Sequence, residues 1–80
     1  MSWSEFNFRK AAAVTKSDST VVNCEGFYVG GTGNVAIIAK DDPTDTAVTL
    51  TACIVGQVYP IACKKIMSTN TTATLIVALF

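Results

Sequence analysis

The sequence has no histidine, and its 80 residues include only two prolines and three cysteines. Without histidine, the commonest general base and the usual nitrogen ligand of zinc are missing. Cys24, Cys53 and Cys63 are odd in number, lack CxxC spacing and follow no signal-peptide pattern, which argues against a paired secreted framework. We therefore expect buried, reduced thiols in a reducing cytosol, and neither a catalytic residue nor a metal or cofactor.

Charge is also scarce. The formal net charge is zero, so no overall field draws the protein to nucleic acid or to anionic lipid. All six acidic residues precede Thr46, and from there to Phe80 the only charged residues are Lys64 and Lys65. These two lysines are expected on opposite faces of one strand, as solubilising charges or as a salt bridge to a partner. The second half of the chain is thus predicted to be core and contact surface.

Two loops carry residues that could suggest ligand binding. VGGTGN (29–34) has the glycines of a phosphate loop but neither the lysine nor a following helix, so it is predicted to be a tight turn. Asp41, Asp42 and Asp45 could ligate calcium, yet their spacing is not that of an EF-hand. With Pro43 they predict an ordinary turn, and the sequence leaves any further role of this loop open.

The rest of the chain consists of short β-rich segments separated by turn residues, at 20–29, 34–40, 46–54, 58–68 and 72–80. Residues 46–54 alternate clearly, and this places Val48, Leu50, Ala52 and Ile54 on one face of a strand. We predict an all-β fold, a small antiparallel sandwich or barrel over residues 20–80.

Residues 1–19 differ from this pattern and are predicted to form an extended N-terminal arm. Trp3, Phe6 and Phe8 stand among polar neighbours without a sustained period. Large aromatic side chains left in water forgo about 1.5–3 kcal/mol each. The arm is therefore expected to dock on a neighbour. An arm folded over its own domain, or a disordered one, stays open as an alternative.

The C-terminal stretch is apolar on both faces of a strand. It comprises Leu75, Ile76, Val77, Ala78, Leu79 and Phe80. It is much shorter than the roughly 20 residues of a spanning helix, so no membrane contact is expected. A domain this small buries only about 60% of its unfolded surface. We therefore predict that this stretch forms an oligomer interface.

Four stretches resemble a family of small virion proteins. They are VTKSDST (14–20), GFYVGGTGNVAI (26–37), GQVYPIACKKIMSTNTTAT (56–74) and the closing IVALF (76–80). In this order they resemble the capsid decoration (cement) and head-spike base proteins of tailed phages and gene-transfer agents. The acidic segment at 41–48 and the aromatic arm depart from that pattern.

The resemblance implies a structural protein, not an enzyme, that self-associates and binds the outer surface of a capsid. We expect a cement protein that contacts the major capsid protein as a homotrimer, is assembled in the host cytoplasm and resides on the capsid exterior. Trp3, Phe6 and Phe8 would form its docking arm. A pentameric head-spike base that anchors a fibre, and a small ligand-binding β-domain unrelated to virions, are the alternatives.

Overall fold

The computed structural model describes residues 8–80, and all regular structure in this range is β-strand. The strands are β1 (Ala11–Ala13), β2 (Gly26–Gly31), β3 (Gly33–Ala39), β4 (Val48–Cys53), β5 (Val58–Tyr59), β6 (Cys63–Ile66) and β7 (Thr74–Leu79). They form two antiparallel sheets, in the orders β1-β7-β2-β5 and β4-β3-β6. The prediction of a small all-β domain is confirmed.

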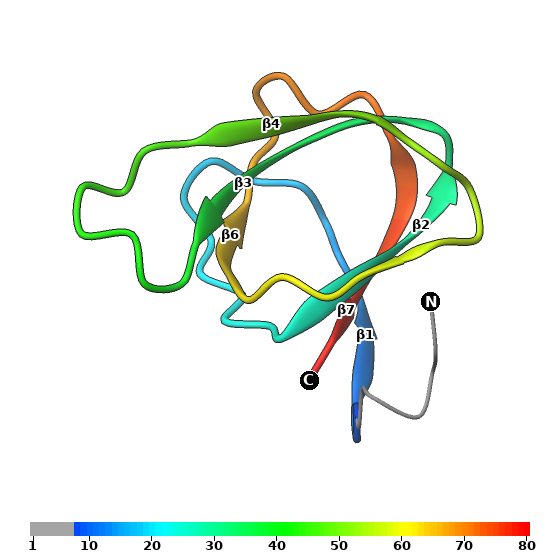
Figure 1. Cartoon of the computed structure of the whole chain (residues 1–80), viewed down its shortest axis with the longest axis horizontal. Coiled ribbons are helices and arrows are strands. Elements are labelled where there is room, and N and C mark those ends of the chain that lie inside the picture. Colours follow the sequence, from blue (N-terminus) through cyan, green and yellow to red (C-terminus); the bar gives the residue numbers. More distant parts are fainter. Residues whose placement is uncertain (1–7) are drawn as a thin grey trace.

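The two sheets enclose a single hydrophobic core (Figure 1). Its largest fully buried side chains come from strands of both sheets and from the bridge between them: Phe27, Ile37, Ile66, Val29, Val35, Cys24 and Cys63. At the edge of the core, the ring of Phe27 stacks on Tyr59 with centroids 5.3 Å apart. Burying each large apolar side chain contributes about 1.5–3 kcal/mol, so this cluster is the main source of stability.

The glycine-rich segment between β2 and β3 is a corner between the sheets, so the prediction of a tight hairpin turn is wrong. Only Thr32 separates the two strands, and they belong to different sheets. Among the described residues, positive φ at glycine occurs at Gly56 and not at the corner. The corner glycines provide space instead. A Cβ on Gly33 would lie 2.5 Å from the backbone nitrogen of Ala73, where the chain enters β7.

The alternation predicted over residues 46–54 breaks within β4. The pairing of β3 with β4 shifts by one residue between Leu50 and Cys53. Ala52 has a φ of 56°, and its N–H donates a hydrogen bond to Oδ1 of Asn34 at 2.9 Å. This β-bulge turns Cys53 into the core and leaves Ala52 exposed, so the predicted common face ends at Leu50.

Part of the segment that was expected to be an arm lies on the domain. β1 pairs with β7 and forms one edge of its sheet. The ring of Phe8 lies against Gly26, since a Cβ there would be 2.9 Å from its Cζ atom. Trp3 and Phe6 lie outside the described residues. The described part of the N-terminal segment thus packs on its own domain.

Replacing Gly33 tests the close contact at the corner. The Gly33→Ala variant should lose about 1–3 kcal/mol of unfolding free energy, because its Cβ would collide with backbone atoms that cannot rotate away. Urea unfolding followed by fluorescence measures the difference. Gly56→Asn is the control, because asparagine tolerates positive φ and no atom lies within 4 Å of the added Cβ. Equal stability of Gly33→Ala and the wild type would contradict the role given to the corner.

Candidate interaction surfaces

β7, the strand predicted to form an interface, is an interior strand of its sheet. It pairs with β1 on one side and with β2 on the other. Both of its backbone edges are therefore occupied, and a second copy of the protein cannot extend the sheet at β7. Only the side chains on its outer face are available to a partner.

The structure divides the C-terminal stretch between core and surface. Ile76 and Ala78 are buried in the chain's own core, and Phe80 packs against it. The alternation of the strand places Leu75, Val77 and Leu79 on the outer face. One face of this stretch is therefore covered within the chain, so Ile76 and Ala78 of the predicted interface residues lie in the core. On the other face, Leu75 is 76% exposed.

Leu75 adopts an unusual backbone conformation for its position. Its φ is 54°, in the left-handed region, which costs a leucine about 1 kcal/mol or more. Its Cβ lies over Gly30, where an added Cβ would be 2.7 Å away. An apolar side chain is thus held in a strained conformation and directed into solvent. Such outliers gather at functional sites.

Two further exposed hydrophobic residues lie in a turn on the opposite side of β2 from Leu75, and they were missed as site residues from sequence. Ile54 and Val55, in the turn between β4 and β5, are 58% and 52% exposed. The turn leans on the end of β2, because the N–H of Gly56 donates to the carbonyl of Val29 at 2.8 Å. We call Ile54, Val55 and Leu75 the apolar corner. The sequence signal for this turn is Gly56, which follows the alternating and uncharged segment 46–54.

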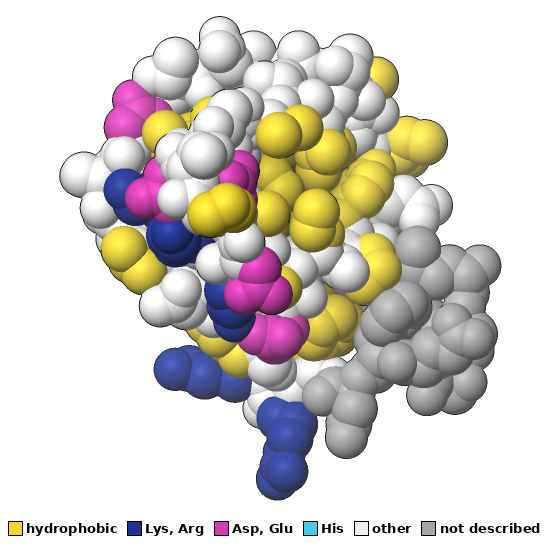
Figure 2. Space-filling model, turned by 60° about the vertical axis from the view of Figure 1, so that its left-hand side comes forward, with side chains coloured by type: hydrophobic (Ala, Val, Ile, Leu, Met, Phe, Trp, Pro, Cys, Tyr) yellow, Lys and Arg dark blue, Asp and Glu magenta, His cyan; other side chains and the backbone are white. Residues whose placement is uncertain are grey.

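Charged side chains are gathered away from this uncharged part of the chain. Figure 2 shows one face of the molecule, with the charged groups at its left and lower sides and hydrophobic groups beside them. Lys40 pairs with Glu25, and Lys64 pairs with Asp45. Lys64, which the sequence offered for a salt bridge to a partner, thus forms an ion pair with Asp45 of its own chain.

The acidic loop uses one carboxylate to shape itself. Asp42 accepts hydrogen bonds from the N–H and the hydroxyl of Thr44 at 2.9 Å, and from the N–H of Thr46 at 3.2 Å. These bonds, chiefly those from Thr44, hold the pKa of Asp42 below its ordinary value. Within residues 8–80, no group of three or more acidic or cysteine side chains is arranged to hold a metal ion.

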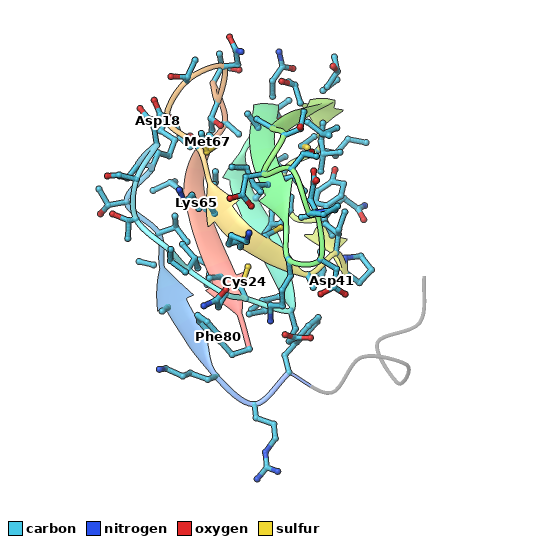
Figure 3. All side chains as sticks on the ribbon, turned by 90° about the vertical axis from the view of Figure 1, so that its left-hand side faces the viewer. Asp18, Cys24, Asp41, Lys65, Met67 and Phe80 are labelled. Atoms are coloured by element: carbon cyan, nitrogen blue, oxygen red, sulfur yellow. The ribbon has the colours of Figure 1, made fainter. Side chains whose placement is uncertain are left out.

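The segment between β1 and β2, which we call the strap (residues 14–24), is tied across the domain by two side chains. Asp18 accepts hydrogen bonds from the N–H groups of Ser68 and Thr69 at 2.8 and 2.9 Å, and from the hydroxyl of Thr69 at 2.5 Å. Figure 3 shows Asp18 beside the loop that follows β6. Nζ of Lys16 donates to the carbonyls of Thr71 and Ala73.

A groove of about 580 Å³ lies between the strap and the end of β7. Ala12, Ala13, Ala78 and Phe80 line its apolar part, and Lys16 and Thr20 supply polar groups. It has no charged pair or buried unpaired donor that would select a particular ligand, as every buried side-chain nitrogen and oxygen among the described residues has a hydrogen-bond partner. Within residues 8–80, no helix has the length and hydrophobicity to span a bilayer.

Comparison with solved structures shows a likeness to a capsid chain. A chain in the solved capsid of a native gene-transfer-agent particle, computed with C5 symmetry, is similar with a TM-score of 0.79 and 26% sequence identity. The match covers 95% of this chain and 87% of that chain. No protein-family model and no curated protein matches the sequence. The likeness therefore extends over nearly the whole domain described above.

The hydrogen bonds of Asp18 predict a pH dependence of stability. They hold the pKa of Asp18 below its ordinary value of 3.8, with the Thr69 hydroxyl as the largest cause. A carboxylate with a lower pKa in the folded state stabilises the fold above about pH 4, and the contribution is lost as the pH falls through the folded pKa. The Asp18→Asn variant should therefore be less stable than the wild type at neutral pH, with a difference that shrinks in acid.

Thermal unfolding at a series of pH values from neutral to strongly acidic measures this difference. Asp41→Asn is the matched control, since it also removes one negative charge but leaves the contact between the strap and the loop after β6 intact. A gap between Asp18→Asn and wild type that is the same at every pH would show that the carboxylate charge does not hold the strap.

Proposed function

We propose that the protein is a virion structural protein that binds the outer surface of a capsid as a decoration protein. The observation that carries the proposal is the likeness, over 95% of the chain, to a chain of a gene-transfer-agent capsid. The ordered sequence resemblance to capsid decoration and head-spike base proteins supports it independently. In this role the protein stabilises the assembled shell, because a ligand that binds one state of an assembly favours that state by mass action.

The apolar corner and the outer face of β7 are the surfaces proposed to contact capsid subunits and neighbouring copies. Leu75 is the residue chosen to test them, because its hydrophobic side chain is 76% exposed and its backbone is strained. A standard interface takes about 800 Å² from each partner. With a total accessible surface of 4690 Å², this protein would contribute roughly a sixth of its surface to each such contact.

The N-terminal segment is proposed as a second attachment. Phe8 packs on its own domain at Gly26, and the residues before it are Met1 to Asn7, including Trp3 and Phe6. Gly26 is paired with Leu79, which places Phe8 on the outer face of β7. The segment that precedes Phe8 carries Trp3 and Phe6, and if these side chains bind capsid they would add avidity to the contact surface.

Two assemblies are proposed for this surface. The first is a homotrimer that contacts several copies of the major capsid protein on the capsid exterior, after assembly in the host cytoplasm. The second is a pentameric head-spike base at a vertex, which carries a fibre. A trimer would fit a threefold axis of a capsid and a pentamer a fivefold axis, so the number of copies distinguishes the two.

The Leu75→Asn variant tests the surface without disturbing the fold. Asparagine tolerates positive φ better than leucine, so the isolated domain should be as stable as the wild type or about 0.5–1 kcal/mol more stable. Self-association and binding to shells should each weaken about tenfold or more, because a central apolar contact is lost. Light scattering coupled to size exclusion gives the mass, and sedimentation with shells that lack the protein gives the occupancy.

Two controls accompany this measurement. Leu75→Met keeps the apolar contact and should bind as the wild type does. Val48→Asn removes a side chain of similar type, 53% exposed, outside the apolar corner. If Leu75→Asn keeps its mass and its occupancy, the apolar corner is not the contact surface. A mass of three copies supports the cement assembly, and a mass of five copies supports the spike base.

Deletion of residues 1–7 tests the second attachment. Phe8 and β1 remain, so the thermal midpoint should stay within a few degrees of the wild-type value. Occupancy on shells should fall about tenfold or more, because aromatic anchors are frequent among the residues that dominate binding energy. The double variant Trp3→Ala/Phe6→Ala should reproduce the loss at full length. Unchanged occupancy of both proteins would remove the docking role from this segment.

A further inference from the structure

Cys24 and Cys63 lie directly opposite each other where the two sheets meet. Each donates its N–H to the carbonyl of the other, at 3.0 and 2.9 Å. They form an antiparallel bridge that lies outside the regular ladders. Residues opposed in this way have Cα atoms about 5.5 Å apart, which is within the range of disulfide-bonded cysteines.

The side chains of the two cysteines share the interior. Both are fully buried, at 0% exposure, and both belong to the one hydrophobic core cluster. Figure 3 shows Cys24 at the end of the strap, where the chain meets the sheets. Both thiols are free. Because paired residues on neighbouring strands direct their side chains to the same side, the two sulfur atoms lie next to each other and not across the sheet.

We propose that Cys24 and Cys63 form a disulfide when the protein meets an oxidising environment, and that this bond locks the two sheets together. Cys24 precedes β2 of one sheet, and Cys63 begins β6 of the other. The bond would close the chain between these residues into a loop that contains β2 to β5. Cross-linking such a loop stabilises the fold mainly by restricting the unfolded chain.

Thiol chemistry at the pair favours the reaction. The neighbouring Cys63 thiol lowers the pKa of Cys24 to about 7. The contact with Cys24, together with burial, raises the pKa of Cys63. The thiolate is the nucleophile in exchange, so Cys24 is the attacking group. Cys53, in β4, has no such neighbour; its thiol donates to the carbonyl of Leu50 at 3.5 Å, and burial raises its pKa.

The oxidant is a small-molecule disulfide, and the exchange balances in two steps. The Cys24 thiolate attacks one sulfur of the small disulfide, which forms a mixed disulfide and releases one small thiolate. Cys63 then loses its proton to solvent and attacks the Cys24 sulfur, which releases the second small thiol. Two protein thiols are oxidised and one small disulfide is reduced. Access requires local opening, and the bridge is a short segment held by few bonds.

The experiment measures thiols in the full chain, and it does not depend on whether the protein binds capsids. Protein purified under reducing conditions is incubated with oxidised glutathione, denatured, and titrated for free thiols. The count should fall from three to one, and the intact mass should fall by two hydrogen atoms. Peptide mapping after cleavage with trypsin at Lys40 and with thermolysin before Val58 separates the three cysteines and should join the Cys24 and Cys63 peptides.

Matched variants assign the bond. Cys53→Ala should lose both of its remaining thiols in the same way, whereas Cys63→Ala should form no internal disulfide. The thermal midpoint of the oxidised wild type should exceed that of the reduced protein by about 10 °C, and reductant should reverse the shift. Cys63→Ala should show no such shift.

A second experiment makes the buried thiols accessible to the oxidant. Reduced, unfolded protein is refolded in a glutathione redox buffer, where all thiols are accessible before the core forms. If three free thiols persist in both experiments, the native pair does not accept the bond and the proposal is wrong. A bond that involves Cys53 or a second copy of the chain, in place of the Cys24–Cys63 bond, would also overturn it.

Discussion

Close backbone contact between the start of β7 and the glycine corner holds the two sheets in place. The chain that leaves β6 returns across residues 30–34, and the carbonyl of Asn34 accepts hydrogen bonds from the N–H groups of Thr72 and Ala73 at 2.9 and 3.0 Å. At this crossing a Cβ on Gly33 would overlap the backbone of Ala73. The sandwich can close only because the corner has no side chains at the points of contact.

The position of β7 follows from that crossing and decides which groups the protein offers to partners. Between β1 and β2, the strand has a pairing partner on each edge and buries Ile76 and Ala78. Its outer face stays open, and Leu75 is turned outward over Gly30 by its positive φ. This conformation places a hydrophobic side chain where an adjoining subunit could bury it.

The polar groups of the protein act mainly within the chain. Asp18 and Lys16 fasten the strap, Asp42 shapes the acidic loop, and the lysines at 40 and 64 pair with acidic neighbours. Surface ion pairs of this kind add little stability, about 0–1 kcal/mol each. The residues of the apolar corner carry no charge of their own that would have to be desolvated when a partner binds.

The sequence by itself determined the strand-rich class and the approximate strand positions, because period-two patterns and turn residues act locally. It also marked the C-terminal stretch as unusual. The tertiary structure alone decided that β2 and β3 occupy different sheets, that the bulge at Ala52 turns Cys53 inward, and that one face of β7 is internal. These features depend on contacts between residues far apart in the chain, such as Gly33 with Ala73, which no local pattern encodes.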